Sequence, residues 1–176
     1  MRIRSLLGLA ATLMALAVSG PGVAHAGSGQ SPAVSIAAND FHELVNTATG
    51  KCVDVVKSSD ANGARVHQWD CGRDPSQLWA SIDLGNGFVQ FVNRKSGKCL
   101  SLVWGTLVVD QQSCNAIDQR QWWQWAPADV FGNLVLVTPP AGGSACLALL
   151  PFSHRNGTRI GIADCATTSS QIWHSE

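Results

Sequence analysis

Six cysteines are the residues of this sequence whose type and spacing most clearly indicate chemistry. They fall into three pairs, and the first members of the pairs, Cys52, Cys99 and Cys146, are 47 residues apart each time. A thiol can close a disulfide or bind a metal, but no Cys-x-x-Cys motif occurs, so a zinc site has little support. A fixed period indicates an internal repeat, and each repeat would close its own bridge. We therefore expect three disulfides, Cys52–Cys71, Cys99–Cys114 and Cys146–Cys165.

The first 26 residues have the three parts of a secretory signal peptide. Arg2 and Arg4 are basic, residues 6–18 form an apolar run of 13 residues, and Ala24-His25-Ala26 provides a cleavage site. The run is too short to cross a bilayer comfortably, although an uncleaved anchor is the alternative. We therefore expect a secreted, extracellular protein in which cysteines form disulfides. Residues 1–26 would be removed, and residues 27–39 would be a flexible leader.

Charge and motifs argue against several classes of function. Beyond residue 26 the sequence has 10 Lys and Arg and 12 Asp and Glu, without a basic run. Nucleic acids and anionic membranes bind basic surfaces, so we expect neither as a partner and no membrane insertion. The sequence also lacks Gly-x-Ser-x-Gly, His-Glu-x-x-His and phosphate-loop motifs. We therefore expect no enzymatic activity, no cofactor and no metal.

A second motif repeats together with the cysteines. Each unit ends in Gln-x-Trp, at residues 77–79, 121–123 and 171–173. Because all three units share the motif, we expect its tryptophans to pack in a common core. A buried glutamine must find hydrogen bonds, and we expect each of these to bind backbone groups of a loop.

Short alternating stretches between turn residues predict strands throughout the three units. In the first unit these are residues 41–46, 52–56, 65–71 and a strand that begins at 77. Four strands in each of three units make about twelve, and no helix of useful length is predicted. One unit cannot bury its apolar face alone, whereas three around an axis can.

The units have predicted boundaries at about residues 40–82, 83–127 and 128–176, which together form one domain. The second unit is four residues shorter between its cysteines, which are 15 apart where the others are 19 apart. The missing residues fall in the loop around Trp104 and Gly105.

The first unit also has a specific motif pattern. It reads Cys52-Val53-Asp54-Val55, then Asn62-Gly63, then Val66-His67-Gln68-Trp69-Asp70-Cys71, then Ser76-Gln77-Leu78-Trp79. These features, with the repeat, resemble the ricin B-chain lectin family, also classed as family 13 carbohydrate-binding modules. The resemblance covers residues 40–176. It implies an all-β domain, a β-trefoil of three repeats with about twelve strands and one disulfide per repeat.

The resemblance also implies a carbohydrate-binding pocket in the first repeat. In the family, an Asp two residues after the first cysteine accepts hydrogen bonds from two sugar hydroxyls, and an aromatic ring two residues before the second cysteine stacks on the sugar. Asp54 and Trp69 hold these positions here. His67, Ser76 and Gln77 stand at or beside the remaining pocket positions. His67 and Ser76 replace the usual Gln and Asn, so we expect a working but weakened pocket.

The other two repeats lack the pair of carboxylate and ring. Ser101 and Gln112 replace it in the second repeat, and Ala148 and Ala163 replace it in the third. We expect both repeats to be structural. For the first-repeat pair itself, the alternative is an ordinary strand-edge carboxylate and a ring packed on the surface.

Three further features remain open at this point. Asn156-Gly157-Thr158 matches the N-glycosylation pattern, but a turn equivalent to Asn62-Gly63 also explains it. Asp70 is expected to be structural, as a turn residue or an acceptor for backbone hydrogen bonds. Trp104 is either a further ligand contact or an exposed loop residue.

We therefore interpret the chain as a secreted lectin or carbohydrate-binding module with one main pocket for galactose- or xylose-type glycans. The alternative is a protein-interaction trefoil, an inhibitor or the non-catalytic subunit of a secreted complex, with degenerate sugar sites. A small hydrolase is a third hypothesis. Only three residues follow Trp173, so we expect no attached glycosidase domain.

Overall fold

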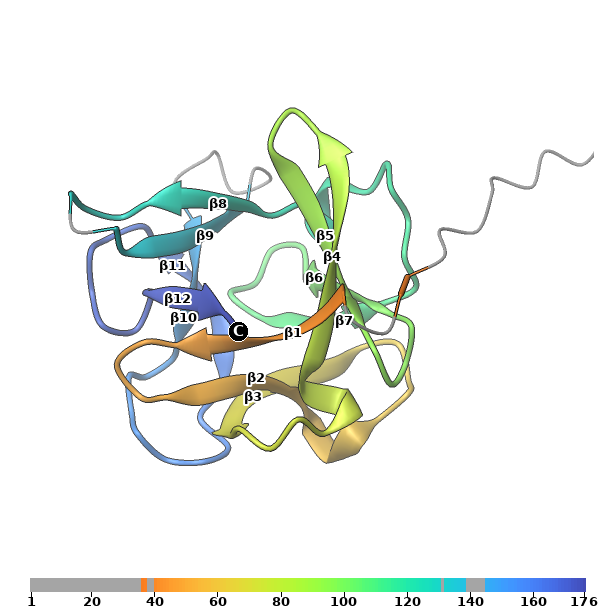
Figure 1. Ribbon diagram of the computed structural model, residues 1–176, viewed down its shortest axis with the longest axis horizontal. Coiled ribbons are helices and arrows are strands. Elements are labelled where there is room, and N and C mark those ends of the chain that lie inside the picture. Colours follow the sequence, from red (N-terminus) through yellow and green to blue (C-terminus); the bar gives the residue numbers. More distant parts are fainter. Residues whose placement is uncertain (1–35, 38–39, 131, 139–144) are drawn as a thin grey trace, which may run out of the picture. The chain divides into compact units, whose positions relative to one another are not determined.

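The fold consists of short β-strands joined by turns (Figure 1). The structure, a computed structural model, describes residues 36–37, 40–130, 132–138 and 145–176. The expected signal peptide and most of the expected leader lie outside these described residues. The strands are β1 (Phe41–Asn46), β2 (Lys51–Val55), β3 (Ala64–Asp70), β4 (Leu78–Gly85), β5 (Phe88–Asn93), β6 (Cys99–Leu102), β7 (Val109–Gln112), β8 (Gln124–Pro127), β9 (Leu134–Thr138), β10 (Ala145–Leu149), β11 (Ile160–Asp164) and β12 (Trp173–Ser175).

These strands follow the predicted ones closely. β1 covers the predicted residues 41–46, and β2 and β3 each begin one residue before the predicted strand. The prediction is wrong at Val56, which begins the 3-10 helix η2 (Val56–Ser58) instead of continuing β2. The reason is that Lys57 leaves the extended region, with φ of 58°. Among the described residues, no helix has the length and apolarity needed to cross a membrane.

Six strands form a ring, and the other six form three hairpins. In the ring, β1 pairs with β4 and β12, β4 pairs with β5, and β9 pairs with β8 and β12, all antiparallel. The ring closes between β5 and β8, where Val89 and Trp123 exchange backbone hydrogen bonds of 2.8 and 2.9 Å. The hairpins β2–β3, β6–β7 and β10–β11 contact one another through β3–β7 pairing and two isolated bridges. The architecture is therefore the expected β-trefoil.

The tryptophans of the Gln-x-Trp motifs occupy the core. Trp79, Trp123 and Trp173 are at most 1% exposed. Each indole N–H donates at 2.9 to 3.0 Å to the backbone carbonyl of the residue after the first cysteine of its repeat, which is Val53, Leu100 or Leu147. The ring is thus buried while its one polar atom has a partner, as a buried indole requires. The prediction of a shared tryptophan core is confirmed.

The glutamines of the same motifs each close the loop after the second cysteine. In Gln77, Gln121 and Gln171, the side-chain carbonyl accepts a backbone N–H at 2.7 to 2.9 Å. The amide group donates to a backbone carbonyl at 2.8 to 3.0 Å. The prediction that these buried side chains bind loop backbone is confirmed.

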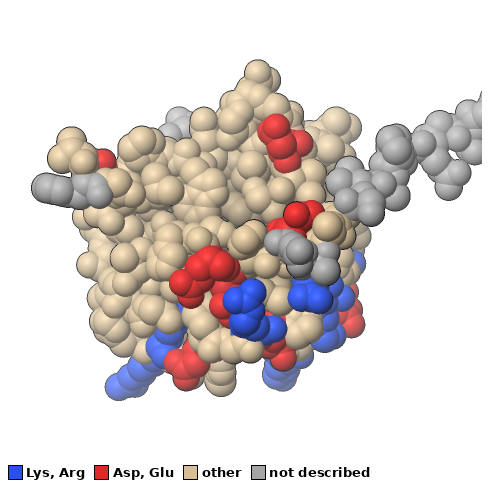
Figure 2. Space-filling model, in the orientation of Figure 1, with Lys and Arg blue, Asp and Glu red and all other residues tan. Residues whose placement is uncertain are grey.

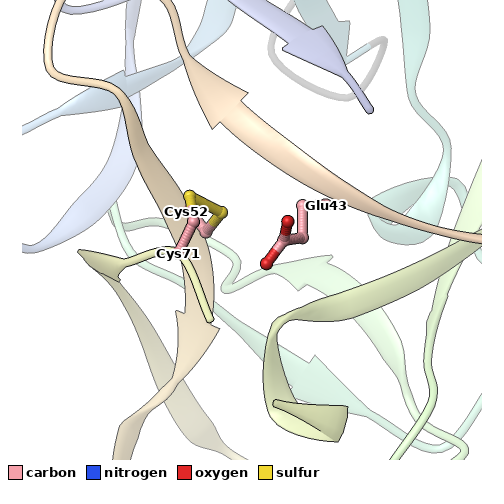
Figure 3. Close-up of side chains that lie close together, drawn as sticks. All are labelled: Glu43, Cys52 and Cys71. Carbon is pink, nitrogen blue, oxygen red and sulfur yellow. A yellow bond between two sulfur atoms is a disulfide. The ribbon is translucent and has the colours of Figure 1, made fainter. Parts of the chain in front are cut away.

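Each repeat closes its own disulfide, with the predicted pairing of Cys52–Cys71, Cys99–Cys114 and Cys146–Cys165. Glu43 of β1 lies beside the first of these disulfides (Figure 3). The two sulfur atoms are bonded to each other, so neither is available as a thiolate ligand. Glu43 instead accepts the backbone N–H of Arg73 at 2.8 Å, so this cluster is structural.

A second set of buried glutamines connects neighbouring repeats, and sequence reasoning missed it. Gln68 on β3 donates to two backbone carbonyls of loop 150–157, at 2.6 and 2.9 Å. Gln111 on β7 does the same with loop 56–63, at 2.7 and 3.0 Å. Their third-repeat counterpart is Ile162, which faces the shortened loop and binds it directly through its own backbone N–H, at 3.0 Å. Gln68 makes the equivalent backbone bond to Thr158, at 2.9 Å, so the third repeat keeps the backbone bond and lacks only the side-chain bridge.

Candidate functional site

A shallow pocket lies between β2, β3 and η2, and we refer to it as the first-repeat pocket. Its volume is about 280 Å³. Asp54 on β2 lies directly opposite His67 on β3, and Trp69 follows two residues along the same strand. Side chains alternate along a strand, so all three project from one face. The pocket is lined by Asp54, Val56, Lys57, Ser58, His67 and Trp69.

Both oxygens of the Asp54 carboxylate have a partner within the protein. Oδ1 accepts a hydrogen bond from the Ser76 hydroxyl at 2.6 Å, and Oδ2 lies 3.1 Å from Nε2 of His67. The Asp54 side chain is 13% exposed, where it borders the pocket. Each carboxylate oxygen has two lone pairs, so it can accept further hydrogen bonds from a ligand.

The indole of Trp69 forms an exposed wall of the pocket. Trp69 is 43% exposed, although it is a large apolar residue. The His67 ring stacks on it, with 5.3 Å between ring centroids and 28° between planes. A β-carbon at Gly157 would lie 3.9 Å from Cζ3 of the indole, so the third repeat also borders the ring. The indole is therefore bordered by His67 and by the third repeat, while part of its surface stays open to solvent.

Ser76 and Gln77 lie inside the protein and do not line the pocket. Both residues are buried and belong to the 3-10 helix η3 (Pro75–Gln77), whose first turn is capped by Asp74. The Ser76 backbone N–H donates to this carboxylate at 3.0 Å and lowers the pKa of Asp74. Ser76 therefore contacts Asp54 from the protein interior, and its hydroxyl positions the Asp54 carboxylate. The Gln77 side-chain carbonyl accepts the Gly72 backbone N–H, and its amide nitrogen donates to the Asp70 backbone carbonyl, each at 2.9 Å.

Three lining residues were missed by sequence reasoning: Val56, Lys57 and Ser58. Lys57 and Ser58 have φ of 58° and 48°, in the left-handed region that non-glycine residues rarely adopt. A Gly or Asn would have indicated such a turn, but neither residue type occurs at these two positions. The pocket wall was therefore not recognisable from residue types.

In the second repeat, the carboxylate stands on the opposite strand of the hairpin. Ser101 on β6 lies opposite Asp110 on β7, so the acid occupies the place of His67. Asp110 is buried, and burial raises the pKa of its carboxyl. Gln112 donates to Asp110 Oδ2 at 2.8 Å, whereas Oδ1 has no hydrogen-bond partner among the described residues. Arg120 pairs with Asp118 through bonds of 2.9 and 3.0 Å from Nε.

In the third repeat, neighbouring chain fills the corresponding space. Gly161 on β11 stands where His67 stands in the first repeat, opposite Ala148 on β10. A β-carbon at Gly161 would lie 2.1 Å from the backbone oxygen of Leu107, in the shortened loop of the second repeat. No side chain fits between them, so this repeat cannot present a residue like His67.

The turn around Asn156 is equivalent to the turn at Asn62-Gly63. Gly157 and Gly63 each donate their N–H to the backbone carbonyl of a neighbouring repeat's glutamine, at 2.9 and 2.8 Å. Asn156 donates to the exposed carboxylate of Asp70 at 2.6 Å. A hydrogen bond from Lys51 lowers the pKa of Asp70. Asp70 thus accepts hydrogen bonds from side chains and not, as expected, from backbone.

Charged residues gather on one part of the visible face. Figure 2 shows Lys, Arg, Asp and Glu mixed over the region of β1, β2 and β3, while the region over β8 and β9 is largely uncharged. The two signs are interspersed, and no patch of a single sign dominates this face.

The fold and the cysteine pattern define a lectin-type β-trefoil, and comparison with known proteins gives the family. A ricin-type β-trefoil lectin domain-like family model matches residues 34–110. A cytolethal distending toxin A/C domain model matches residues 77–174, which is more than half of the chain. The chain therefore belongs, over residues 77–174, to the cytolethal distending toxin A/C domain family, and its first part is similar to the ricin-type β-trefoil lectin-like domain. A sequence search found no matching curated protein.

Solved structures agree with this assignment. The designed three-fold symmetric protein ThreeFoil is 26% identical, with a TM-score of 0.71 over 77% of this chain and 97% of its own. An exo-β-1,3-galactanase from Clostridium thermocellum is also 26% identical, with a TM-score of 0.70 over 80% of this chain. This chain spans only 31% of that enzyme.

A lectin shows the same fold at lower identity. The C-terminal half of an earthworm R-type lectin, solved in complex with GalNAc, is 16% identical, with a TM-score of 0.63 over 78% of this chain and 98% of its own. The chain thus shares its β-trefoil fold with this lectin.

Proposed function

We propose that this chain is a secreted carbohydrate-binding module that holds one sugar residue in the first-repeat pocket. The observation that carries the proposal is that the Asp54 carboxylate and the exposed Trp69 ring line the same pocket. Three disulfides and the lectin and toxin families support an extracellular location. The likeness to a galactanase supports a galactose-type ligand, with a xylose-type ligand as the alternative.

The pocket offers the two contacts that a sugar ring needs. Asp54, positioned by Ser76, accepts hydrogen bonds from two neighbouring hydroxyls, and charge makes these bonds strong. Trp69 covers the apolar C–H face of the ring at a low entropy cost, since His67 already packs against it. The sugar leaves the site without covalent change. A single pocket of this kind binds a simple sugar weakly, at about millimolar concentration, unless several copies act together.

A glycan array with the secreted form tests this proposal. We expect binding to galactose- or xylose-type glycans that is lost in Asp54→Ala and in Trp69→Ala. Asp164→Ala is the matched control, because Asp164 is an exposed aspartate of the third repeat and lies outside the pocket. Thermal melting checks that every variant is folded. Glycan binding that survives Asp54→Ala unchanged contradicts the proposal.

A second candidate function is binding of a secreted protein partner through the later repeats. The toxin-domain model matches residues 77–174, which include both repeats that lack the carboxylate and ring. Trp104 and Leu107 in this part are 61% and 59% exposed, which is unusual for large apolar residues. An empty glycan array, together with stoichiometric capture of one partner that Trp104→Ser abolishes, would favour this function.

A further inference from the structure

Lys57 places an unpaired cation at the rim of the first-repeat pocket. It lines the pocket together with Asp54, on the turn that directly follows β2. Within the described ranges, no carboxylate lies at ion-pair distance from the Lys57 ammonium. Two nearby lysines differ, because Lys51 pairs with Asp70 and Lys95 with Asp60. Lys57 is therefore available to a ligand.

The backbone at this position supports a role for the side chain. Lys57 and Ser58 both adopt left-handed φ values, of 58° and 48°. Such conformations cost about 1 to 3 kcal/mol each for residues other than glycine and concentrate at functional sites. Glycine would remove the strain, yet the turn carries a lysine. The left-handed turn ends the extended path of β2 and places Lys57 beside the pocket.

The other charged groups at the pocket already have partners. Asp54 is held by Ser76 at 2.6 Å and faces His67 at 3.1 Å. Asp74 lies behind Ser76, 2.9 Å from its hydroxyl, and does not line the pocket. A ligand in the pocket therefore contacts two groups. The Asp54 carboxylate on β2 can accept hydrogen bonds from the ligand's hydroxyl groups, and the Lys57 ammonium on η2 is free to pair with an anion.

We propose that the first-repeat pocket prefers a sugar that carries a carboxylate, a uronic acid, over the corresponding neutral sugar. Asp54 accepts the ring hydroxyls, and Lys57 pairs with the carboxylate at the sugar's C6. Hexuronic acids combine these two chemistries in one ring, with neighbouring hydroxyls and an anionic group. This inference rests on the proposed carbohydrate-binding function.

Two pairs of ligands test the preference directly. Titration calorimetry of the secreted form compares methyl β-D-galactoside with methyl β-D-galacturonide, and methyl β-D-xyloside with methyl β-D-glucuronide. Each pair shares the configuration of its ring hydroxyls. The galactose pair differs at C6, which is a hydroxymethyl group in one sugar and a carboxylate in the other, whereas xylose has no C6 and carries a hydrogen where glucuronide carries the carboxylate. At low ionic strength we expect about two- to fivefold tighter binding of the acid in the pair that binds, the range of an exposed ion pair. The preference should shrink in high salt, which screens exposed charges.

Substitutions at Lys57 separate this inference from the proposed function. Lys57→Gln should make the acid and neutral sugars bind equally, and Lys57→Glu should reverse the preference. Lys98→Gln, in the second repeat, should change neither. Equal binding of acid and neutral sugar by the unmodified chain, or a preference that survives Lys57→Gln, overturns the inference and leaves the proposed function standing. Binding of none of the four sugars overturns the proposed function and this inference with it.

Discussion

The first and second repeats each have a pair of residues that face each other across a hairpin, but the acidic residue stands on the first strand in one repeat and on the second strand in the other. Asp54 faces His67 across β2 and β3, whereas Ser101 faces Asp110 across β6 and β7. In the first repeat both carboxylate oxygens have partners, and the group borders a pocket. In the second repeat one carboxylate oxygen is buried and has no hydrogen-bond partner in the part of the chain that the structure describes. The carboxylate on the first strand of the hairpin thus borders an open pocket, while the one on the second strand is enclosed.

Equivalent turns of a neighbouring repeat border both sites. A β-carbon at Gly63 would lie 3.9 Å from Asp110 Oδ2, and one at Gly157 would lie 3.9 Å from Cζ3 of Trp69, which is nevertheless 43% exposed. Because the two turns are alike, the difference lies in the residues that the hairpins themselves carry.

The largest effect is expected at Gly161 in the third repeat, where any side chain, such as the one that the first repeat carries at His67, would collide with the neighbouring loop. Gly161→Ala adds the β-carbon that every other residue type carries, 2.1 Å from the Leu107 backbone oxygen. Because a backbone atom must move, we expect a loss of about 3 kcal/mol in the free energy of unfolding, measured by urea denaturation.

Gly72→Ala provides the control for that substitution. A β-carbon at Gly72 would be 3.8 Å from Gln77 Oε1, which is an ordinary contact, so stability should change little. Equal stability of both variants would show that β11 and the shortened loop are not packed as closely as described.

Exchanging a repeat-connecting glutamine should have a smaller effect. Gln68→Ile introduces the residue type of the third repeat. The Ser153 carbonyl loses its hydrogen bond from Gln68, whereas the Arg155 carbonyl keeps one from the Thr158 hydroxyl at 2.7 Å. We expect a loss of about 2 kcal/mol, since a partly buried acceptor that loses its donor is costly. Urea denaturation measures it, with Gln119→Ile, an exposed glutamine on η4 (Gln119–Gln121), as the control. An unchanged midpoint for Gln68→Ile would mean that the loop does not depend on this side chain.

Much of the fold was predictable because its determinants repeat within the sequence. The 47-residue period gave the disulfide pairing, and three copies of Gln-x-Trp indicated both the core indoles and the loop-binding glutamines. The face shared by Asp54 and Trp69 followed from the family motif. That Asp54 and Trp69 bind a sugar remains a prediction.

The rest of the site depends on contacts that no local pattern encodes. The left-handed turn at Lys57 carries no glycine or asparagine, so residue types did not reveal it. Ser76 was expected to line the pocket, but it is buried in η3 and contacts Asp54 from the protein interior. Asp110 is bordered by a loop about fifty residues earlier in the chain, around Gly63. Such contacts between repeats require the three-dimensional arrangement.

The smallest expected effect concerns Asp110 and has the opposite sign. Burial raises the pKa of this carboxyl, so ionising it disfavours the folded state. Stability should therefore fall as pH rises from the unfolded value near 3.8 through the higher folded pKa. Asp110→Asn removes the charge and keeps an acceptor for Gln112, so at pH 7 we expect a gain of about 1 kcal/mol, the order of one unsatisfied buried group.

Acid should abolish that gain, because both states of the unmodified protein are protonated below the unfolded pKa. Thermal melting between pH 3 and 7 therefore separates relief of a buried charge from a change in packing, which would persist at every pH. Asp54→Asn is the matched control. In the first repeat both carboxylate oxygens are hydrogen-bonded, so the same chemical change should bring no gain at pH 7. A gain of equal size in both variants would mean that ionised Asp54 and ionised Asp110 destabilise the folded state equally. The strand that carries the carboxylate would then make no difference to stability.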